Sequence, residues 1–224
     1  MSFCIAIDGP AGAGKSTIAR KLAARLCLVY VDTGAMYRAM AYHLLRKGTD
    51  FTDQAQISAD CQDADISIAY DNGEQIVLLN GENVNPYLRS EAVSEKASVS
   101  STNGDVRKRL VLLQQKLAEH TDLIMDGRDI GTCVLPGAQL KIYLTASAST
   151  RAKRRYLELT QKGVNCDLNE IEREINERDY RDMHREISPL RKADDAVEVD
   201  TSDMTIDQVV SQIMEMALKK RKAG

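Results

Sequence analysis

The sequence predicts an α/β fold built on a parallel sheet, because strand and helix patterns alternate along the chain. The run FCIAI at residues 3–7 is apolar and stops at a glycine-rich turn, as a buried strand does. Residues 15–26 then carry apolar side chains at helical spacing, and LVYV at 28–31 is a second apolar strand. Another helical pattern follows residue 34. This succession is typical of a parallel sheet flanked by helices.

The rhythm changes between residues 64 and 87. Three short extended segments, DISIAY, QIVLLN and ENVNPY, are separated by DNGE at 71–74 and NGEN at 80–83. Both separators contain the Asn-Gly pair that signals a hairpin turn. We therefore expect a small antiparallel sheet of about three strands, inserted into the parallel fold.

The second half of the chain completes the parallel sheet. A helical pattern resumes near residue 91 and is strong at 105–118. Three apolar runs follow: LIM, which ends at Asp126, KIYLTA at 141–146, and AVEVD, which ends at Asp200. With the two strands before the insert they predict five parallel strands. A last helix is expected at 205–220, and its KKRK end suits a helix C-terminus.

Length, charge and cysteine usage narrow the class of protein. The 224 residues fit one core domain with a sizeable insertion, or two small domains. No apolar run approaches the roughly 18 residues of a membrane span, so we expect no membrane contact. The net charge of −3 provides no field that would attract nucleic acid. The five cysteines are odd in number and lack C-x-x-C spacing, which predicts free thiols in a cytoplasmic protein and no zinc site.

The stretch GPAGAGKS at residues 9–16 matches the P-loop pattern G-x-x-x-x-G-K-[ST] between a predicted strand and a predicted helix. Its glycines allow backbone N–H groups to surround an anion, and the helix N-terminus adds its dipole. Lys15 places a positive charge against the outer phosphates, and Ser16 offers a hydroxyl to Mg²⁺. The predicted nucleoside triphosphate site comprises Gly9, Pro10, Ala11, Gly12, Ala13, Gly14, Lys15, Ser16 and Thr17.

Three classes of P-loop protein are compatible with that loop: a GTPase switch, a motor or assembly ATPase, and a small-molecule kinase. The chain contains no Asn-Lys pair, so it lacks the N-K-x-D segment that reads guanine. An ATPase is expected to have a strand that ends in Asp-Glu, in which the glutamate positions the attacking water. Here the strand ends at Asp126, and Gly127 follows it, so no carboxylate is offered to water. Asp126 remains well placed to help order Mg²⁺, directly or through water. These features favour transfer to a bound acceptor.

The type of acceptor follows from the side chains on offer. An alcohol acceptor needs a general base, whereas a phosphate monoester has a second pKa of about 6 and is already a dianion near neutral pH. It needs cations instead. Arg38 and Arg128 lie at strand-to-helix junctions, and the segments TRAKRR and ERDYRDMHR add further arginines, which suit transition-state charge on a phosphoryl group. Solvated helix faces braced by ion pairs remain the alternative for the two segments.

Five motifs resemble those of the bacterial cytidylate kinases: IAIDGPAGAGKST, VYVDTGAMYR, DGRDIGT, KIYLTAS with RAKRR, and RDYRDMHREISPL. They occur in family order between about residues 3 and 200. The resemblance implies the P-loop nucleoside monophosphate kinase fold, a single domain over residues 1–224 with a five-stranded parallel sheet. Its implied parts are a core of about 1–35, 88–148 and 167–224, a monophosphate-binding region of about 36–87 with the β insert at 64–87, and a helical lid of about 149–166.

The resemblance also implies the reaction: ATP-dependent phosphorylation of CMP and dCMP to CDP and dCDP, by in-line transfer assisted by Mg²⁺ and arginines. The implied partners are ATP and CMP or dCMP, without nucleic acid or membrane, and the protein is expected to be a monomer. Two alternatives remain open at this point. One is a P-loop kinase for another small acceptor, such as UMP, another monophosphate or a hydroxy-acid. The other is a nucleotide-binding module that does not catalyse transfer.

Site residues are implied by position in the matching motifs. The implied catalytic residues are Lys15, Arg128, Arg154 and Arg185. The lid residues over ATP are Arg154 and Arg155. The acceptor and its phosphate are lined by Thr33, Tyr37, Arg38 and Arg128. The cytosine edge is read by Ser98, Arg107 and Asp129, and the ribose or phosphates are contacted by Arg178, Asp182 and Arg185. The implied metal ligands are Ser16 and Asp126.

The cytosine assignment has a physical basis. A carboxylate such as that of Asp129 accepts from the exocyclic amine of cytosine, while an arginine donates to the ring carbonyl and nitrogen. Uracil presents a carbonyl where cytosine presents the amine, so it would leave Asp129 facing an acceptor, at a cost of about 1–3 kcal/mol. We therefore expect CMP to be preferred over UMP.

Overall fold

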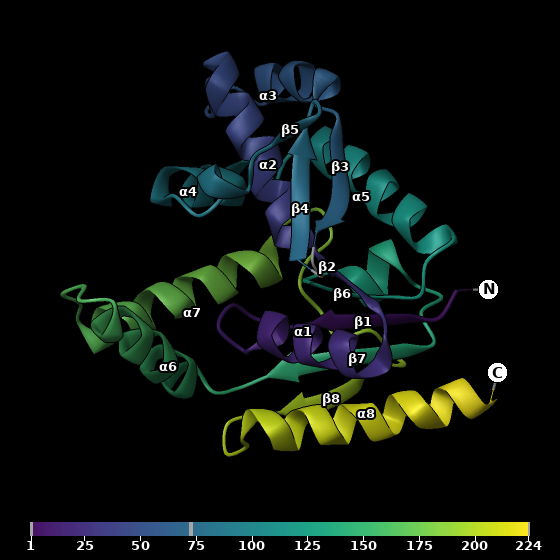
Figure 1. Ribbon diagram of the computed structural model, residues 1–224. Helices are drawn as coiled ribbons and strands as arrows, with labels where there is room; N and C mark the ends of the chain where they lie inside the picture. The colour runs from purple at the N-terminus through teal and green to yellow at the C-terminus, as the bar shows by residue number, and fades with distance from the viewer. Residues whose placement is uncertain (1, 72–73, 224) are drawn as a thin grey trace. The chain divides into compact units, whose positions relative to one another are not determined.

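The structure, a computed structural model, describes residues 2–71 and 74–223. Its internal contacts divide the chain into two compact units. The smaller unit comprises Val31–Thr121, and the larger unit comprises Ser2–Tyr30 together with Asp122–Gly224. Figure 1 labels the helices and strands of both units.

The larger unit is built on the predicted parallel sheet. Among the described residues this sheet has five strands, in the order β2 (Val29–Asp32), β6 (Leu123–Gly127), β1 (Cys4–Asp8), β7 (Leu140–Thr145) and β8 (Val197–Asp200) (Figure 1). The five predicted strands are thereby confirmed. The central strand β1 pairs in parallel with both β6 and β7 and is buried along its whole length. Burial on both faces explains why it reads as an uninterrupted apolar run.

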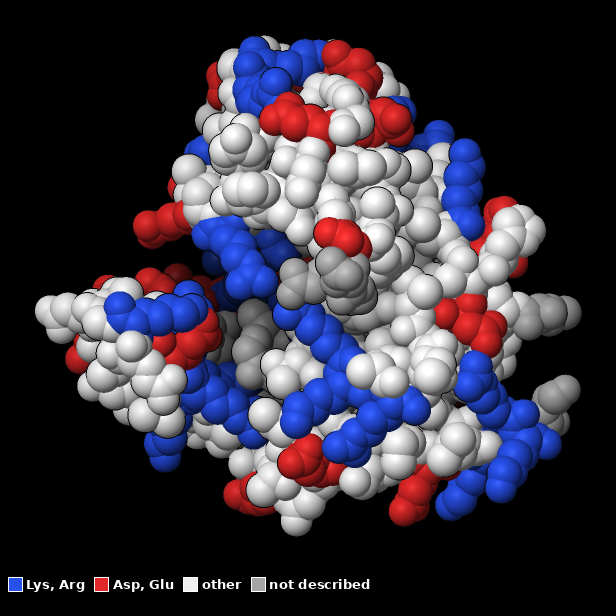
Figure 2. Space-filling view, viewed as in Figure 1, with Lys and Arg blue, Asp and Glu red and all other residues white. Residues whose placement is uncertain are grey.

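Helices α1 (Lys15–Leu26) and α8 (Ile206–Ala223) pack against this sheet and against each other. Ile18 and Leu22 of α1 and Ile213 of α8 join the strand residue Ile142 in one apolar core. Each such fully buried aliphatic side chain stabilises the fold by about 1.5–3 kcal/mol. The last turn of α8 carries basic residues, which Figure 2 shows clustered near the C-terminus. Their positive charge interacts favourably with the negative end of the helix dipole.

Helix α1 ends at an unusual residue. Cys27 caps it with φ 54° and ψ 44°, a left-handed conformation, and its N–H donates to the carbonyl of Ala23. Glycine is the usual residue at such a position, because a side chain there costs about 1–2 kcal/mol. The sharp reversal delivers the chain directly to the start of β2 at Val29.

Helices α6 (Ala148–Gln161) and α7 (Leu168–His184) pack together as a helical hairpin in the larger unit. On the face shown in Figure 2 basic and acidic side chains lie next to one another on this hairpin. Its exposed ion pairs include Arg155 with Glu158 and Arg173 with Glu170. Exposed pairs of this kind contribute about 0–1 kcal/mol each to the free energy of unfolding. Much of the charge on the hairpin therefore keeps its surface hydrated and adds little to stability.

The smaller unit contains the predicted antiparallel sheet, with β3 (Ile66–Asp71), β4 (Glu74–Leu79) and β5 (Glu82–Asn83) in that order. Asn80 and Gly81 join β4 to β5 with φ 50° and 81°, so the second Asn-Gly signal is confirmed. The first signal, at residues 72–73, lies outside the described residues. The expectation that ENVNPY is extended throughout was wrong. Residues Asn85–Tyr87 form a short 3-10 helix, η2, because Pro86 has no N–H for a strand ladder.

Helices of the smaller unit are α2 (Thr33–Lys47), α3 (Gln54–Asp60), α4 (Glu91–Ser100) and α5 (Gly104–Glu119), with the 3-10 turn η1 (Cys61–Asp63). The helices expected after residue 34, near 91 and at 105–118 are confirmed. Helix α3 was not predicted, because seven residues are too few to show a hydrophobic period. It is nucleated by Asp53, whose carboxylate accepts from the backbone N–H groups of Ala55 and Gln56.

Cys4, Cys27, Cys61, Cys133 and Cys166 are free thiols in the structure. Burial raises the pKa of the Cys4 and Cys61 thiols, which makes both poor nucleophiles. Of the helices within residues 2–71 and 74–223, none combines the length and the apolar character needed to cross a bilayer.

Candidate functional site

Glycines shape the predicted P-loop between β1 and α1. Gly9 has φ 148°, and a Cβ atom there would lie 1.9 Å from the carbonyl oxygen of Leu144, so only glycine lets the loop pass against β7. Gly12 and Gly14 adopt φ 77° and 88°, which favour glycine as well. Gly14 also serves as the N-cap of α1, and the helix begins at Lys15. The loop thus turns tightly into a helix N-terminus, the geometry of an anion site.

Lys15 is buried and folds back over the loop. Its ammonium donates a 2.8 Å hydrogen bond to the carbonyl of Pro10. Burial, and next the nearby Arg128 guanidinium, lower the pKa of Lys15 well below its ordinary value, although Asp126 and Asp8 act in the opposite direction. A phosphate group at the loop would restore this pKa, because a negative charge close by favours the protonated amine.

Ser16 and Asp126, the two residues predicted to bind Mg²⁺, are brought together by the fold. The Ser16 hydroxyl donates to Oδ2 of Asp126 at 2.8 Å, and the Tyr30 hydroxyl donates to Oδ1 at the same distance. Oxygen ligands of this type suit Mg²⁺, which keeps several waters and binds through one or two protein groups together with phosphates. Within the part of the chain that the structure describes, no cluster of three or more acidic, histidine or cysteine side chains would hold a metal alone. The donor set therefore fits Mg²⁺ bound together with a nucleotide.

Asp8, at the end of β1, was not among the predicted site residues. Its two carboxylate oxygens accept from the N–H groups of Ile130 at 2.8 Å and Gly131 at 2.7 Å, which begin the π-helical turn η3 (Ile130–Val134). Burial raises the pKa of Asp8 to about 6 against these hydrogen bonds. The contact holds in place the segment that directly follows Arg128. The sequence offered one sign of this role: an acidic residue stands where a buried apolar strand meets the P-loop.

Arginines and acids meet between the end of β6 and helix α7 of the larger unit. Arg128 Nε donates to Asp182 at 2.8 Å, and a guanidinium nitrogen of Arg185 lies 3.7 Å from a carboxylate oxygen of Asp129. Burial acts to raise the pKa of Asp182, but the charge of Arg128 and its hydrogen bond hold that pKa below its usual value. Arg178 lies on α7 one turn before Asp182. The structure thus brings together the five predicted acceptor residues of the larger unit: Arg128, Asp129, Arg178, Asp182 and Arg185.

The remaining predicted acceptor residues belong to the smaller unit. Thr33, Tyr37 and Arg38 lie on the first turns of α2, Ser98 lies on α4, and Arg107 lies on α5. The buried Arg107 guanidinium is 5.5 Å from the ring centroid of Tyr37, so these two side chains are brought together. Arg38 pairs with Asp32 at 3.1 Å. Contact between the acceptor and these five residues of the smaller unit, Thr33, Tyr37, Arg38, Ser98 and Arg107, stays a prediction.

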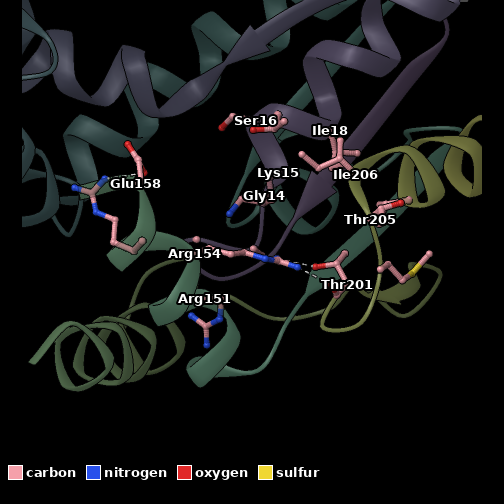
Figure 3. A pocket seen from close by; sticks show the side chains of 16 residues that line it. Gly14, Lys15, Ser16, Ile18, Arg151, Arg154, Glu158, Thr201, Thr205 and Ile206 are labelled. Atoms are coloured by element: carbon pink, nitrogen blue, oxygen red, sulfur yellow. Dashed lines mark hydrogen bonds and ion pairs between the residues drawn. The ribbon is translucent and has the colours of Figure 1, made fainter. Parts of the chain in front are cut away.

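A cavity of about 600 Å³ lies within the larger unit (Figure 3). The P-loop lines it from Gly12 to Thr17, and helix α6 contributes the arginines Arg151, Arg154 and Arg155. The loop after β8 and the start of α8 supply a part of the lining that sequence reasoning missed: Thr201, Met204, Thr205, Ile206 and Val209. The available signal was position, because ligands of open α/β sheets bind at the carboxyl ends of the strands.

The two predicted lid arginines have different partners. Arg154 extends toward Thr201 (Figure 3), where its Nη2 donates to the backbone carbonyl at 2.6 Å and Nη1 to the hydroxyl at 3.2 Å. Arg155 donates to Glu158 at 3.0 Å in an exposed ion pair. Arg154 is therefore already docked on the cavity wall, whereas Arg155 is held at its rim by a weak surface pair.

Comparison with known proteins agrees with this geometry. The family model described as cytidylate kinase matches residues 5–219 of the chain. The cytidylate kinase of Lactobacillus johnsonii is 48% identical over 218 residues, covering 97% of this chain and 95% of the relative. That of Bacillus licheniformis is 47% identical over 219 residues, covering 97% of each. The crystal structure of an uncharacterized protein from Eubacterium ventriosum superposes with a TM-score of 0.52 at 13% identity, over 96% of this chain and 98% of that one, a likeness that bears on the fold alone.

Proposed function

Because the chain belongs to the cytidylate kinase family and is therefore a P-loop kinase that phosphorylates CMP, we propose that it transfers the γ-phosphoryl group of ATP in line to the phosphate of CMP or dCMP. The observation that carries this mechanism is the cavity of the larger unit, where the P-loop, Lys15 and the arginines of α6 converge. Such convergence supplies positioning and charge stabilisation, the two contributions that phosphoryl transfer requires from a protein.

The donor site is the P-loop and the cavity beside it. Loop N–H groups and the α1 N-terminus bind the phosphates of ATP. Lys15 exchanges the Pro10 carbonyl for phosphate oxygens, and Arg154 exchanges Thr201 for the oxygens of the transferring group. The apolar lining from Met204 and Val209 offers surface for the base of the nucleotide.

Mg²⁺ is held, in this proposal, by the Ser16 hydroxyl and the Asp126 carboxylate, directly or through water. When bound, it neutralises charge on the β- and γ-phosphates. The contribution of the chain is orientation: Tyr30 donates to one oxygen of Asp126, and this fixes the plane of the carboxylate.

The acceptor needs cations and no general base, because its phosphate is already a dianion near neutral pH. In the larger unit Arg128, Arg178 and Arg185 outnumber the acids Asp129 and Asp182, so the group carries excess positive charge. We assign catalytic roles to Lys15, Arg128, Arg154 and Arg185, each through charge stabilisation of the transferring phosphoryl group.

Thr33, Tyr37 and Arg38 of the smaller unit are proposed to contact the acceptor and its phosphate. Reading of the cytosine edge is proposed for Ser98, Arg107 and Asp129, and contact with the ribose or the phosphates for Asp182. The support in the smaller unit is the contact between Tyr37 and Arg107, which presents an aromatic ring and a guanidinium fork together. A fork of this kind suits the ring carbonyl and nitrogen of cytosine. The support for Asp182 is its pairing with Arg128.

One assay tests the proposal as a whole. The purified chain is incubated with ATP and Mg²⁺, and ADP release is followed against CMP, dCMP, UMP, AMP and shikimate, with a reaction lacking acceptor as the control. We expect rapid release with CMP and dCMP and little without acceptor. ADP release that does not depend on the acceptor, or CMP that stays unphosphorylated, would contradict the mechanism.

We further propose a monomer located in the cytoplasm. The support for the location is the set of five free cysteines, two of them buried, which suits a reducing compartment. Light scattering of the purified chain tests the oligomeric state, since a mass near 24.8 kDa is expected. A mass of about twice that value would contradict the monomer.

A further inference from the structure

Arg151 joins three separate segments of the larger unit. Its Nε donates to the carbonyl of Ala146 at 2.9 Å, Nη1 donates to the carbonyl of Ala11 at 3.0 Å, and Nη2 donates to the carboxylate of Asp179 at 2.6 Å. Arg151 lies on the first turn of α6, Ala11 in the P-loop and Asp179 on α7. Both ionised side chains are buried. One guanidinium therefore ties the P-loop to the helical hairpin α6–α7.

We propose that Arg151 is a positioning residue for ATP: it holds the P-loop in its phosphate-binding shape through Ala11, and Asp179 holds Arg151. This inference rests on the proposed function, in which the P-loop binds ATP. The sequence analysis gave the arginines of the TRAKRR segment, Arg151 among them, a role in balancing charge on the phosphoryl group, and the present inference gives Arg151 a different role. Arg151 lines the cavity together with Arg154 and Arg155, but each of its guanidinium nitrogens already donates to a protein acceptor, so it acts on the nucleotide through the backbone of the loop.

The geometry of the peptide group explains how one carbonyl bond shapes the loop. A trans peptide is planar, and its N–H points away from its C=O. The bond from Arg151 to the Ala11 carbonyl therefore sets the direction of the Gly12 N–H, which belongs to the predicted phosphate cradle. Gly12 also packs on the stem of Arg151, since a Cβ there would lie 3.4 Å from Arg151 Cβ. The guanidinium and its stem together restrain the Ala11–Gly12 peptide.

The charge arrangement separates Arg151 from its two neighbours. Each of the three guanidinium nitrogens of Arg151 donates to a protein acceptor, one of them a buried carboxylate that balances the charge. Arg154 instead binds an uncharged threonine, and Arg155 binds an exposed glutamate. A planar fork that meets three acceptors in fixed directions cannot be replaced by the single ammonium of lysine.

The test measures binding of ATP and of CMP to the full-length chain by calorimetry, together with the thermal midpoint. The variants are Arg151→Lys, Arg151→Met, Asp179→Asn and the double variant Arg151→Met with Asp179→Asn. Lys153→Met is the matched control, because Lys153 lies on the same helix and is exposed. Arg151→Lys keeps the charge beside Asp179 and removes the fork, so it separates geometry from charge.

We expect Arg151→Lys to weaken ATP binding about tenfold, the effect of losing one hydrogen bond to a charged group, and to leave CMP binding unchanged. Asp179→Asn should weaken ATP binding in the same direction, and the double variant should add little to Arg151→Met, because the two side chains act as one unit. Lys153→Met should bind both nucleotides as the wild type does. If Arg151→Met does not fold, Arg151→Lys and Asp179→Asn decide.

Wild-type ATP affinity in folded Arg151→Lys would overturn the inference, and so would equal losses of ATP and CMP affinity, since a purely structural residue affects both. Failure of the proposed function has a different signature. If the wild-type chain itself does not bind ATP, both the proposed donor site and the role of Arg151 are wrong. If wild type binds ATP and the variants lose only that affinity, the inference stands whatever the acceptor assay shows.

Discussion

The hydroxyl of Ser16 donates a 2.8 Å hydrogen bond to Oδ2 of Asp126, although 110 positions separate the two residues in the chain. The contact joins the first turn of α1, which follows strand β1, to the end of the neighbouring strand β6. Parallel strands place their carboxyl ends at one edge. The two oxygen donors proposed for Mg²⁺ therefore meet where the P-loop ends.

Asp126→Asn should raise the Mg²⁺ concentration needed for half-maximal rate by about tenfold or more, because the amide removes the negative charge that attracts the cation. The fold should persist, since one amide oxygen can still accept from Ser16 or Tyr30. The measurement is the initial rate against Mg²⁺ at fixed ATP and CMP. An unchanged Mg²⁺ dependence would remove Asp126 from the metal site.

Lys15→Met should lower kcat by at least about a hundredfold, because it removes a donor aimed at transition-state charge. Its thermal midpoint should equal or exceed that of the wild type, since burial already lowers the pKa of this ammonium and methionine fills similar space. Lys21→Met is the control: Lys21 lies on the same helix and forms an exposed ion pair with Asp207. Near-normal turnover in Lys15→Met would contradict the donor scheme.

Asp129→Asn should narrow the ratio of kcat/KM for CMP over UMP by about tenfold to a hundredfold, because an amide can donate to the carbonyl of uracil where a carboxylate cannot. Asparagine also keeps the volume next to Arg185, so the arginine is not left beside a hole. Asp65→Ala, an exposed acid in the smaller unit, serves as control. An unaltered ratio would show that Asp129 does not read the base.

Asp8 should make the free energy of unfolding fall as pH rises from about 4 to 6. Its folded pKa is about 6, above the ordinary value of 3.8, so in this window the folded chain keeps a proton that the unfolded chain has released. A shift of about two units corresponds to about 3 kcal/mol, fully lost above pH 6. Urea unfolding at several pH values measures it.

Asp8→Asn does not titrate at this position, so the free energy of unfolding of the wild type, minus that of the variant, should fall as pH rises from about 4 to 6. The comparison of slopes is the control, because every other titrating group is shared by the two proteins. Equal slopes would show that burial does not raise the pKa of Asp8. A difference between the two proteins that rises with pH over this window would contradict the direction of the shift.

Local patterns sufficed for much of the fold. The apolar runs predicted all five strands of the parallel sheet, and the Asn80-Gly81 pair predicted the turn between β4 and β5. Helix α3 was not predicted, because a helix of seven residues is too short to show a hydrophobic period. The short helix η2 stands where a strand was expected, because Pro86 has no N–H to donate within a sheet. The errors are confined to short elements, where neighbouring structure outweighs local preference.

The sequence by itself determined the P-loop, the alternation of strands and helices, and the motifs that indicate a cytidylate kinase, because each depends on residues within one short stretch. Only the tertiary structure decided partners: Asp182 for Arg128, Ala11 and Asp179 for Arg151, and Ile130 and Gly131 for Asp8. The strand order β2-β6-β1-β7-β8 does not follow the chain, so residues far apart in sequence become neighbours at one edge of the sheet. Spacing along the chain carries no record of those distances.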